Sequence, residues 1–115
     1  MFDELTILRD ASALARHSAM RHQVIAENIA NANTPGYVAK DIQDFNSVYA
    51  QNRDFGSSVE WRASEIRNPT TASPNGNTVS LQEELMKSAQ TEGRHDAAIA
   101  IYRKTMDILK MSLGR

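Results

Sequence analysis

The strongest constraint on the fold of this chain is the uninterrupted heptad pattern in its last third. From Ser80 to Leu113 there is no proline, and one set of residues recurs at alternating spacings of four and three. Such spacing is typical of a helix that packs along one face, and about 34 helical residues would extend roughly 50 Å. The predicted seam consists of Leu81, Leu85, Ser88, Glu92, His95, Ile99, Tyr102, Met106, Leu109 and Leu113.

Local signals mark both ends of this predicted helix. Ser80 and Glu83 have the spacing of a capping box, in which each side chain bonds the backbone amide of the other residue. Gly114 follows the last residue of the seam and is typical of a helix end. We therefore expect a helix over residues 80–113.

The centre of the seam is polar, at Ser88, Glu92 and His95, and Gly93 lies beside it. A glycine in a helix interior costs about 1 kcal/mol relative to alanine. Two explanations stay open: the helix bends or frays at this point, or neighbouring subunits supply the contacts that the seam lacks. The second explanation is favoured.

A second helix is predicted from Asp3 to about Asn33. Pro35 ends it, because the residue before a proline is displaced from the α region. Asn33 can adopt the left-handed conformation at the helix end, and Pro35-Gly36 suits a type II turn. The predicted packing face comprises Leu5, Leu8, Ala15, Ala19, His22, Ile25, Ala26 and Ile29.

Three asparagines, Asn28, Asn31 and Asn33, lie near the end of this helix. Their amides compete for backbone hydrogen bonds, so one interpretation is a frayed end with an Asx-type turn. The other is an amide cluster that binds the returning strand or the next subunit, and the two interpretations are compatible. An apolar set after the turn is expected to fold back on the helix: Tyr37, Val38, Ile42 and Phe45.

The middle of the chain, residues 46–79, is rich in Ser, Thr and Asn, with prolines at positions 69 and 74 and an Asn75-Gly76 turn signal. Val59, Trp61 and Ala63 alternate with polar residues, which allows one short strand or a β-hairpin arm. The remainder of this segment is predicted to be irregular.

The predicted fold is therefore mainly all-α. Long N- and C-terminal helices pair as a coiled-coil-like hairpin, and the irregular middle segment can hold a short β-hairpin. One structural unit divides into residues 1–45 (helix and turn), 46–79 (polar insertion) and 80–115 (heptad helix).

Composition argues against several classes of function. The formal net charge is −1, with no block of like charge, so the basic footprint of a general nucleic-acid or anionic-membrane binder is missing. The chain has no cysteine, which excludes disulfides, thiolate nucleophiles and thiolate metal sites. No run of about 18 apolar residues could span a bilayer, and charged residues near the start interrupt any secretory signal.

No pattern of catalytic or metal-binding residues is present either. His17 and His22 are separated by roughly 140° around a helix, so they do not face one ligand. Glu83 and Glu84 would lie in a first helical turn, where they favour the helix dipole. Nucleophile-elbow, phosphate-loop and dinucleotide motifs do not occur. We predict that the protein is not an enzyme and uses no cofactor or metal.

Three segments resemble one known family. The stretch from Ile25 to Tyr37, IAENIANANTPGY, resembles the N-terminal signature of flagellar rod and hook proteins. Residues 39–45, AKDIQDF, and 76–86, GNTVSLQEELM, are similar to short proximal-rod members of that family. Many relatives have an acidic residue where Ser80 stands here, a minor departure because serine caps a helix well. The resemblance covers about residues 10–45 and 75–113.

This resemblance implies a structural subunit of the proximal rod of the flagellar basal body. Such subunits polymerise through their terminal helices into the axial tube that transmits torque and lines the export channel. It also implies a place in the rod within the periplasmic space, reached through the flagellar type III export apparatus. Two alternatives stay open: another short rod subunit of the FlgC type, or a free-standing helical adaptor or chaperone-like binding protein.

Partners and contact residues follow from the same resemblance. The implied partners are further copies of the chain, the rod proteins FlgC, FlgF and FlgG, the rod-base adaptor FliE, the MS ring and the export gate. Neither nucleic acid nor a transmembrane segment is implied. Assembly contacts are expected at Asn28, Asn31, Asn33, Pro35, Gly36, Tyr37, Leu81, Leu85, Ile99, Tyr102, Met106, Leu109 and Leu113.

Overall fold

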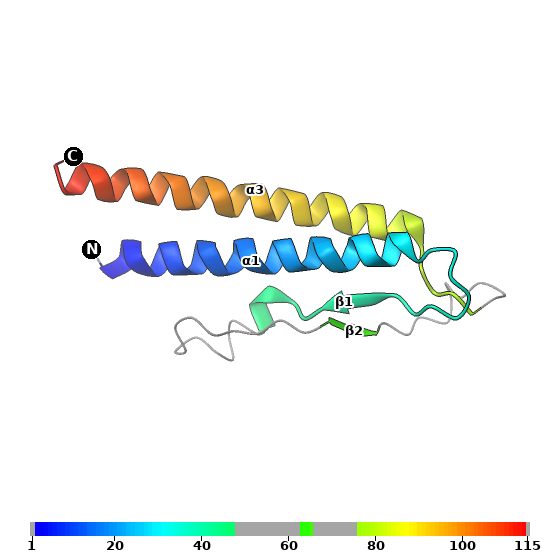
Figure 1. Ribbon diagram of the computed structural model, residues 1–115. Coiled ribbons are helices and arrows are strands. Elements are labelled where there is room, and N and C mark those ends of the chain that lie inside the picture. Colours follow the sequence, from blue (N-terminus) through cyan, green and yellow to red (C-terminus); the bar gives the residue numbers. More distant parts are fainter. Residues whose placement is uncertain (1, 48–62, 66–75, 115) are drawn as a thin grey trace.

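Two long helices dominate the fold. A computed structural model describes residues 2–47, 63–65 and 76–114. Helix α1 spans Phe2–Ala30 and helix α3 spans Leu81–Ser112. They run antiparallel, side by side, so that the start of α1 and the end of α3 lie at the same end of the hairpin (Figure 1). The predicted helical hairpin is confirmed.

Helix α3 begins and ends where its capping signals predict. Ser80 has an extended backbone, and its hydroxyl accepts the N–H of Glu83 at 3.4 Å, which is one half of the predicted capping box. At the other end, Gly114 has a φ of +74° and donates its N–H to the carbonyl of Met111. The helix is continuous through Gly93, so it does not break there.

Helix α1 ends slightly earlier than predicted and in a different way. No described residue other than glycine has a positive φ, so the left-handed conformation expected at Asn33 was wrong. The chain instead leaves the helix through successive tight turns. In these turns the Ala32 N–H donates to the Ile29 carbonyl and the Thr34 N–H donates to the Asn31 carbonyl. These bonds satisfy groups at the helix end that would otherwise lack partners.

None of the buried residues of α3 belongs to the predicted seam. They follow a spacing of seven: Glu84, Thr91, Ala98 and Thr105. The alternate positions of the predicted seam lie beside them, and Ser88, His95 and Leu109 are half-buried there. The other predicted positions are 85, 92, 99 and 106. Each of them comes one residue after a member of the buried stripe. Apart from Glu84, the side chains of this stripe are small, and the larger apolar residues of α3 lie toward the rim.

Helix α1 is covered on two sides, so its buried residues form a wider set than the predicted face. Of the predicted residues, Ile25 is buried, and Leu8, Ala15 and His22 are half-buried. The remaining four, Leu5, Ala19, Ala26 and Ile29, are exposed, and that part of the prediction was wrong. The buried set is Ala11, His17, Ser18, Val24, Ile25 and Asn28.

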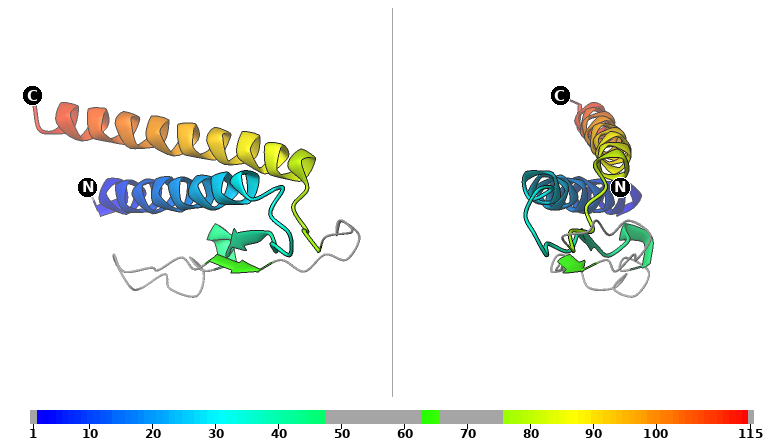
Figure 2. Two further views of the ribbon diagram at one scale, coloured as in Figure 1. Left: turned by 45° about the vertical axis from the view of Figure 1, so that its right-hand side comes forward. Right: turned by 90° about the vertical axis from the view of Figure 1, so that its right-hand side faces the viewer.

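The second layer on α1 is a short sheet that was only partly predicted. Strand β1, Lys40–Ile42, pairs antiparallel with strand β2, Ala63–Glu65 (Figures 1 and 2). Ile42 packs with Val24, and Phe45 packs against the same cluster, which confirms that this part of the chain folds back on α1. The strand expected around residues 59–63 coincides with β2 only at Ala63. Positions 59 and 61 lie outside the described residues.

Candidate functional site

The signature segment is organised around one buried side-chain amide. Asn28 is fully buried near the end of α1. Its Nδ2 donates to the carbonyl of Lys40 at 2.7 Å, and its Oδ1 accepts the N–H of Lys40 at 3.0 Å. The amide therefore pairs with both backbone groups of one residue in β1, as a neighbouring strand would. This confirms the interpretation that asparagines of this cluster bind the returning strand.

Tyr37 completes the contacts of this amide. Its hydroxyl donates to Oδ1 of Asn28 at 3.0 Å, so that oxygen accepts two hydrogen bonds. Burial raises the pKa of the Tyr37 phenol, and the nearby carboxylates of Glu27 and Glu84 raise it further. The phenol therefore stays protonated and remains a donor at neutral pH.

Asn31 supports the compatible local interpretation. Its Nδ2 donates to the Glu27 carbonyl at 2.9 Å, and its Oδ1 accepts the hydroxyl of Thr34 at 3.1 Å. These short-range bonds close the turn that follows α1. Asn33 and Pro35, two further residues of the signature, are exposed. The three asparagines thus have three different environments.

Residues just before α3 hold the turn from the other side. Asn77 is buried, and its Nδ2 donates to the carbonyls of Asn31 at 2.8 Å and Thr34 at 2.7 Å. Thr78 donates its N–H to the Tyr37 carbonyl at 3.0 Å, and its hydroxyl accepts the N–H of Ala39 at 2.8 Å. These bonds join residues that are 39 to 46 positions apart in the sequence. We call Asn28, Asn31, Tyr37, Asn77 and Thr78 the polar clamp.

Sequence reasoning missed two of the five residues of the polar clamp. Asn77 and Thr78 were noticed only as part of the segment that resembles the family, and no contact was assigned to them. A signal was present, because the polar groups of the Gly-Asn-Thr stretch just before the helix need hydrogen-bond partners if that stretch is buried. The structure shows that they bind the end of the other helix.

Two glycines bring the clamped segments together. Gly36 has a φ of +75°, as the predicted type II turn requires, and the Tyr37 N–H donates to the Thr34 carbonyl across it. Gly76 has a φ of +84°, and a Cβ atom there would lie 3.5 Å from the Cα of Gly36. Both positions need the left-handed region, which glycine enters at low cost.

Replacing Gly36 by valine is expected to lower the free energy of unfolding by about 2 kcal/mol, because a β-branched residue is strained at this positive φ. Nothing lies within 4 Å of the added Cβ, so the loss comes from backbone strain and not from a clash. Gly36→Asn is the control, since asparagine tolerates the left-handed region better. Equal thermal stability of the two variants in denaturation experiments would contradict this account.

A chain of charges joins α1, β1 and α3 beside the polar clamp. Arg21 donates from Nε and Nη2 to the two carboxylate oxygens of Asp41, each at 3.1 Å. Lys87 lies 3.8 Å from the same carboxylate and 3.4 Å from Oε1 of Glu84. Glu84 is almost fully buried, although its sequence position suggested a solvated first-turn acid. Bidentate pairing of Arg21 with Asp41 fixes the orientation of β1 on α1.

His17 is packed between α1 and the segment that follows β1. It is buried on α1, its Nε2 lies 2.8 Å from the Gln43 carbonyl, and its ring meets Phe45 edge to face. Burial lowers the pKa of His17, and the positive charges of Arg21 and Arg94 lower it further. The hydrogen bond to Gln43 acts in the opposite direction.

Acidification is expected to weaken the packing of residues 43–45 on α1. Because the folded-state pKa of His17 lies below that of the unfolded chain, the unfolded state binds the proton more readily. The contribution of His17 to stability is therefore complete above about pH 6.5 and is lost as the pH falls below it. His17→Gln should reduce the difference in Tm between about pH 7.5 and about pH 5.5. A pH dependence that survives His17→Gln intact would refute this assignment.

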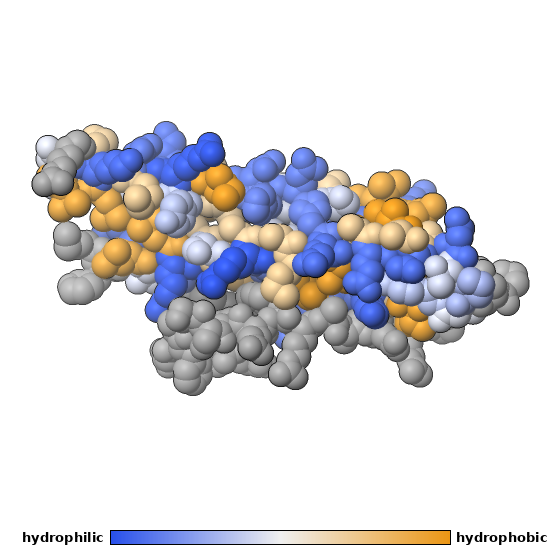
Figure 3. Space-filling model, in the orientation of Figure 1, coloured by the Kyte–Doolittle hydropathy of each residue, from blue (hydrophilic) through white to orange (hydrophobic). Residues whose placement is uncertain are grey.

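The apolar residues predicted for assembly lie on the rim of α3. Large exposed fractions occur at Leu81 (52%), Leu85 (64%) and Leu113 (62%), and Tyr102 is 40% exposed. Ile99, Met106 and Leu109 are half-buried. Figure 3 shows apolar surface near both ends of α3 with a more hydrophilic stretch between them. The predicted seam is thus only partly used inside the subunit.

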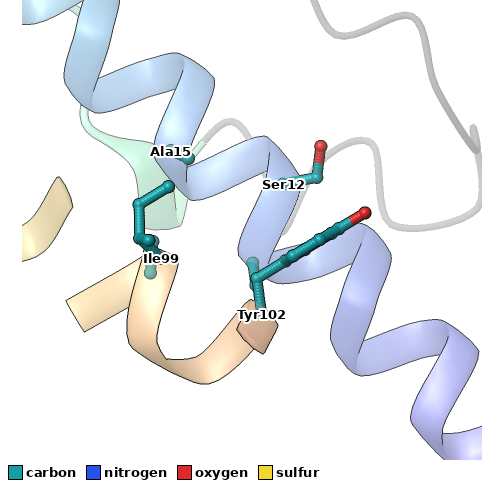
Figure 4. A pocket seen from close by; sticks show the side chains of 6 residues that line it. Ser12, Ala15, Ile99 and Tyr102 are labelled. Atoms are coloured by element: carbon teal, nitrogen blue, oxygen red, sulfur yellow. The ribbon is translucent and has the colours of Figure 1, made fainter. Parts of the chain in front are cut away.

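A hollow of about 220 Å³ lies between the two helices on this rim. Its floor is made by Ala11, Ala15 and Ala98, with Ser12 at its edge. Figure 4 shows the side chain of Ile99 directed toward Ala15 and the ring of Tyr102 extending toward Ser12. The helices approach closely here through alanines while larger side chains line the edge.

The described part of the chain offers no arrangement for metal or membrane chemistry. Within residues 2–47, 63–65 and 76–114, no three His, Asp or Glu side chains gather in a way that could hold a metal ion. Neither α1 nor α3 contains a stretch long and apolar enough to cross a bilayer. The geometry is that of a helical hairpin closed at one end by the polar clamp.

Comparison with known proteins agrees with this geometry. Residues 10–37, which include the whole signature from Ile25 to Tyr37, match the family model described as flagella basal body rod protein. The chain is 27% identical to the flagellar basal body rod protein FlgB of Agrobacterium fabrum, over 91% of this chain and 90% of the relative. It is 29% identical to FlgB of Escherichia coli, over 87% and 88% of the two chains, and 29% identical to FlgB of Cereibacter sphaeroides, over 81% and 82%. The chain is thus a relative of FlgB, and it is a structural subunit of the flagellar basal-body rod.

Proposed function

We propose that this rod subunit polymerises through α1 and α3 in the proximal part of the rod. There it forms part of the axial tube that transmits torque and lines the export channel. The observation that carries this proposal is the apolar rim of α3, where Leu81, Leu85 and Leu113 are each more than half exposed. Because the hairpin packs mainly through small residues, these leucines contribute little to packing within the subunit. Exposed apolar surface of this kind is typical of interaction sites.

The predicted assembly residues divide into two groups with different roles. Asn28, Asn31, Gly36 and Tyr37 act inside the subunit, because their contacts or backbone conformation fix how α1, β1 and α3 meet. The rim residues of α3 act between subunits. Contacts between unlike faces of identical chains produce a helical filament when they do not close into a ring. Asn33 and Pro35 are exposed at the clamped end, where they are available to a neighbouring subunit.

Partners and location follow from the place of such a subunit in the rod. Its neighbours are further copies of the chain, the rod proteins FlgC, FlgF and FlgG, the adaptor FliE, the MS ring and the export gate. The subunit reaches the periplasmic space through the flagellar type III apparatus. The protein has a structural role and is not an enzyme. Residues 1–45 and 80–115 form the assembling hairpin and residues 46–79 are an insertion between them.

Deletion of the gene in its own host tests this proposal. We expect non-motile cells in which assembly stops after the basal ring, and full recovery when the wild-type gene is restored. Side-chain imaging of the purified basal body should then place α1 and α3 in the wall of the proximal rod. Motile, normally flagellated deletion cells, or a rod that lacks this chain, would refute the proposal.

A further inference from the structure

Glu84 is a buried acid in a helix contact whose other members on α3 are small. It is 1% exposed, and the remaining residues of its stripe are Thr91, Ala98 and Thr105. Its Oε1 accepts a hydrogen bond from Lys87 at 3.4 Å, and within the described residues its Oε2 has no hydrogen-bond partner. A buried ion pair that is incompletely satisfied contributes little to stability, and apolar residues of similar volume are often at least as stable in its place. Stability alone therefore does not account for an acid at this position.

Lys87 connects this acid to strand β1. Its Nζ lies 3.8 Å from Oδ2 of Asp41, although α1 lies between α3 and the sheet in Figures 1 and 2. Asp41 is itself held in place, because Arg21 donates to both of its carboxylate oxygens and the N–H of Ile42 donates to its Oδ1. The side chains of Lys87, Asp41 and Arg21 are each less than one-fifth exposed, so salt screens their attraction only weakly. We define the charge bridge as Glu84, Lys87, Asp41 and Arg21.

The polar clamp does not determine how α3 is rotated about its own axis. Its last member, Thr78, is separated from the start of α3 by Val79 and Ser80, and Ser80 has an extended backbone. The clamp therefore fixes where α3 begins but leaves a two-residue link about which the helix can turn. The charge bridge is attached to α3 at positions 84 and 87, inside the helix, so it acts on the rotation directly.

A different rotation of α3 would bury more apolar side chain. The stripe one residue further along consists of Leu85, Glu92, Ile99 and Met106, of which three are large and apolar. The stripe that faces α1 has no large apolar member, and Leu85 is left 64% exposed. Successive helical residues are about 100° apart, so hydrophobic burial alone favours a turn of that size, which would carry Lys87 away from β1.

We propose that the charge bridge is a rotational lock, which selects the stripe of Glu84 to face α1 and keeps the stripe of Leu85 on the rim. Lys87 is the positioning residue, since its ammonium group joins α3 to the fixed carboxylate of Asp41. Glu84 holds the same ammonium group from the inside of the helix contact. The lock concerns the single chain, and only its consequence for assembly rests on the proposed function of the rim.

Thiol labelling of the purified full chain tests the lock. The chain has no cysteine, so a single cysteine at position 91 or 92 reports which stripe is buried. With the bridge intact, Thr91→Cys should react slowly because position 91 is buried, and Glu92→Cys should react rapidly because position 92 is exposed. Glu84→Gln/Lys87→Met removes both charges of the bridge on α3 and keeps the side-chain lengths similar. It should make labelling about tenfold faster at position 91 and about tenfold slower at position 92.

Two controls separate rotation from loss of folding. Lys87→Arg keeps a positive charge beside Asp41 and should retain the wild-type labelling pattern. Glu83→Gln/Lys104→Met removes the same two kinds of charge from exposed positions of α3 and should retain it as well. An unchanged pattern in Glu84→Gln/Lys87→Met would overturn the lock. Fast labelling at both positions would also overturn it, because the bridge would then stabilise the contact without selecting a rotation.

Complementation of a strain that lacks the gene tests the consequence for assembly. Glu84→Gln/Lys87→Met should restore about tenfold fewer motile cells than Lys87→Arg, because the apolar stripe of Leu85 would be turned inward. If the labelling pattern reverses and motility is nevertheless normal, the lock stands and the assembly role proposed for the rim is refuted. If motility falls while the labelling pattern is unchanged, the lock is overturned and the role of the rim is unaffected.

Discussion

Replacing Asn28 by alanine should lower the free energy of unfolding by about 3 kcal/mol, the largest loss expected from any single side chain described here. The substitution removes three hydrogen bonds, two to the backbone of Lys40 and one to Tyr37. It also leaves the N–H and carbonyl of Lys40 facing a cavity. Chemical denaturation followed by circular dichroism measures the loss.

Two companion variants separate the amide from the side-chain volume. Asn28→Asp keeps the accepting oxygen but replaces the donor to the Lys40 carbonyl with a buried acceptor, so it should destabilise the fold at least as strongly as alanine. Asn33→Ala changes an exposed asparagine of the same signature and should shift stability by no more than about 0.5 kcal/mol. Similar losses at positions 28 and 33 would show that the buried amide is not what holds β1 on α1.

The second large effect concerns assembly and not folding. Leu85→Asp should leave the stability of the subunit within about 0.5 kcal/mol of the wild type, because the side chain is 64% exposed. Burying a leucine contributes about 1.5–3 kcal/mol, so a charge in its place should weaken each contact between subunits by about tenfold or more. Since every subunit repeats the contact, we expect loss of motility in complementation tests.

Gln82→Asp is the control for this substitution. It introduces the same charge at an exposed position one turn earlier on α3, outside the apolar rim. It should therefore restore motility normally. If Leu85→Asp cells swim like Gln82→Asp cells, then the rim near the start of α3 does not contact a neighbour.

The main errors of the sequence-based prediction have one physical origin. Heptad spacing identified α3, but the prediction used one seam both as the packing face of the hairpin and as the surface for assembly. The structure buries Ala98 and Thr91 instead, since two helices in close contact select small side chains where their backbones meet. Periodicity shows that a helix has a packing face and does not show which of two adjacent stripes faces its own partner. The leucine stripe was the more apolar one, and it was available for a neighbour.

The contacts that close the polar clamp could not be predicted from local sequence patterns either. Capping by Ser80, the positive φ of Gly36 and the turn after α1 depend on residues a few positions apart, and these were predicted correctly. The pairing of Asn77 with the Asn31 and Thr34 carbonyls joins segments separated by more than forty residues. Which residue becomes the hydrogen-bond partner of Asn77 therefore depends on how the whole chain folds.

By itself, the sequence determined two long helices, the start and end of α3, the turn at Pro35-Gly36 and the resemblance to rod proteins, because capping, proline geometry and heptad spacing act over a few residues. Only the tertiary structure decided that Asn28 pairs with β1, that Glu84 is buried, and that the leucines of α3 lie on the rim. The last two of these outcomes depend on how closely α1 and α3 approach. That distance is set by packing along both helices together, and no single segment encodes it.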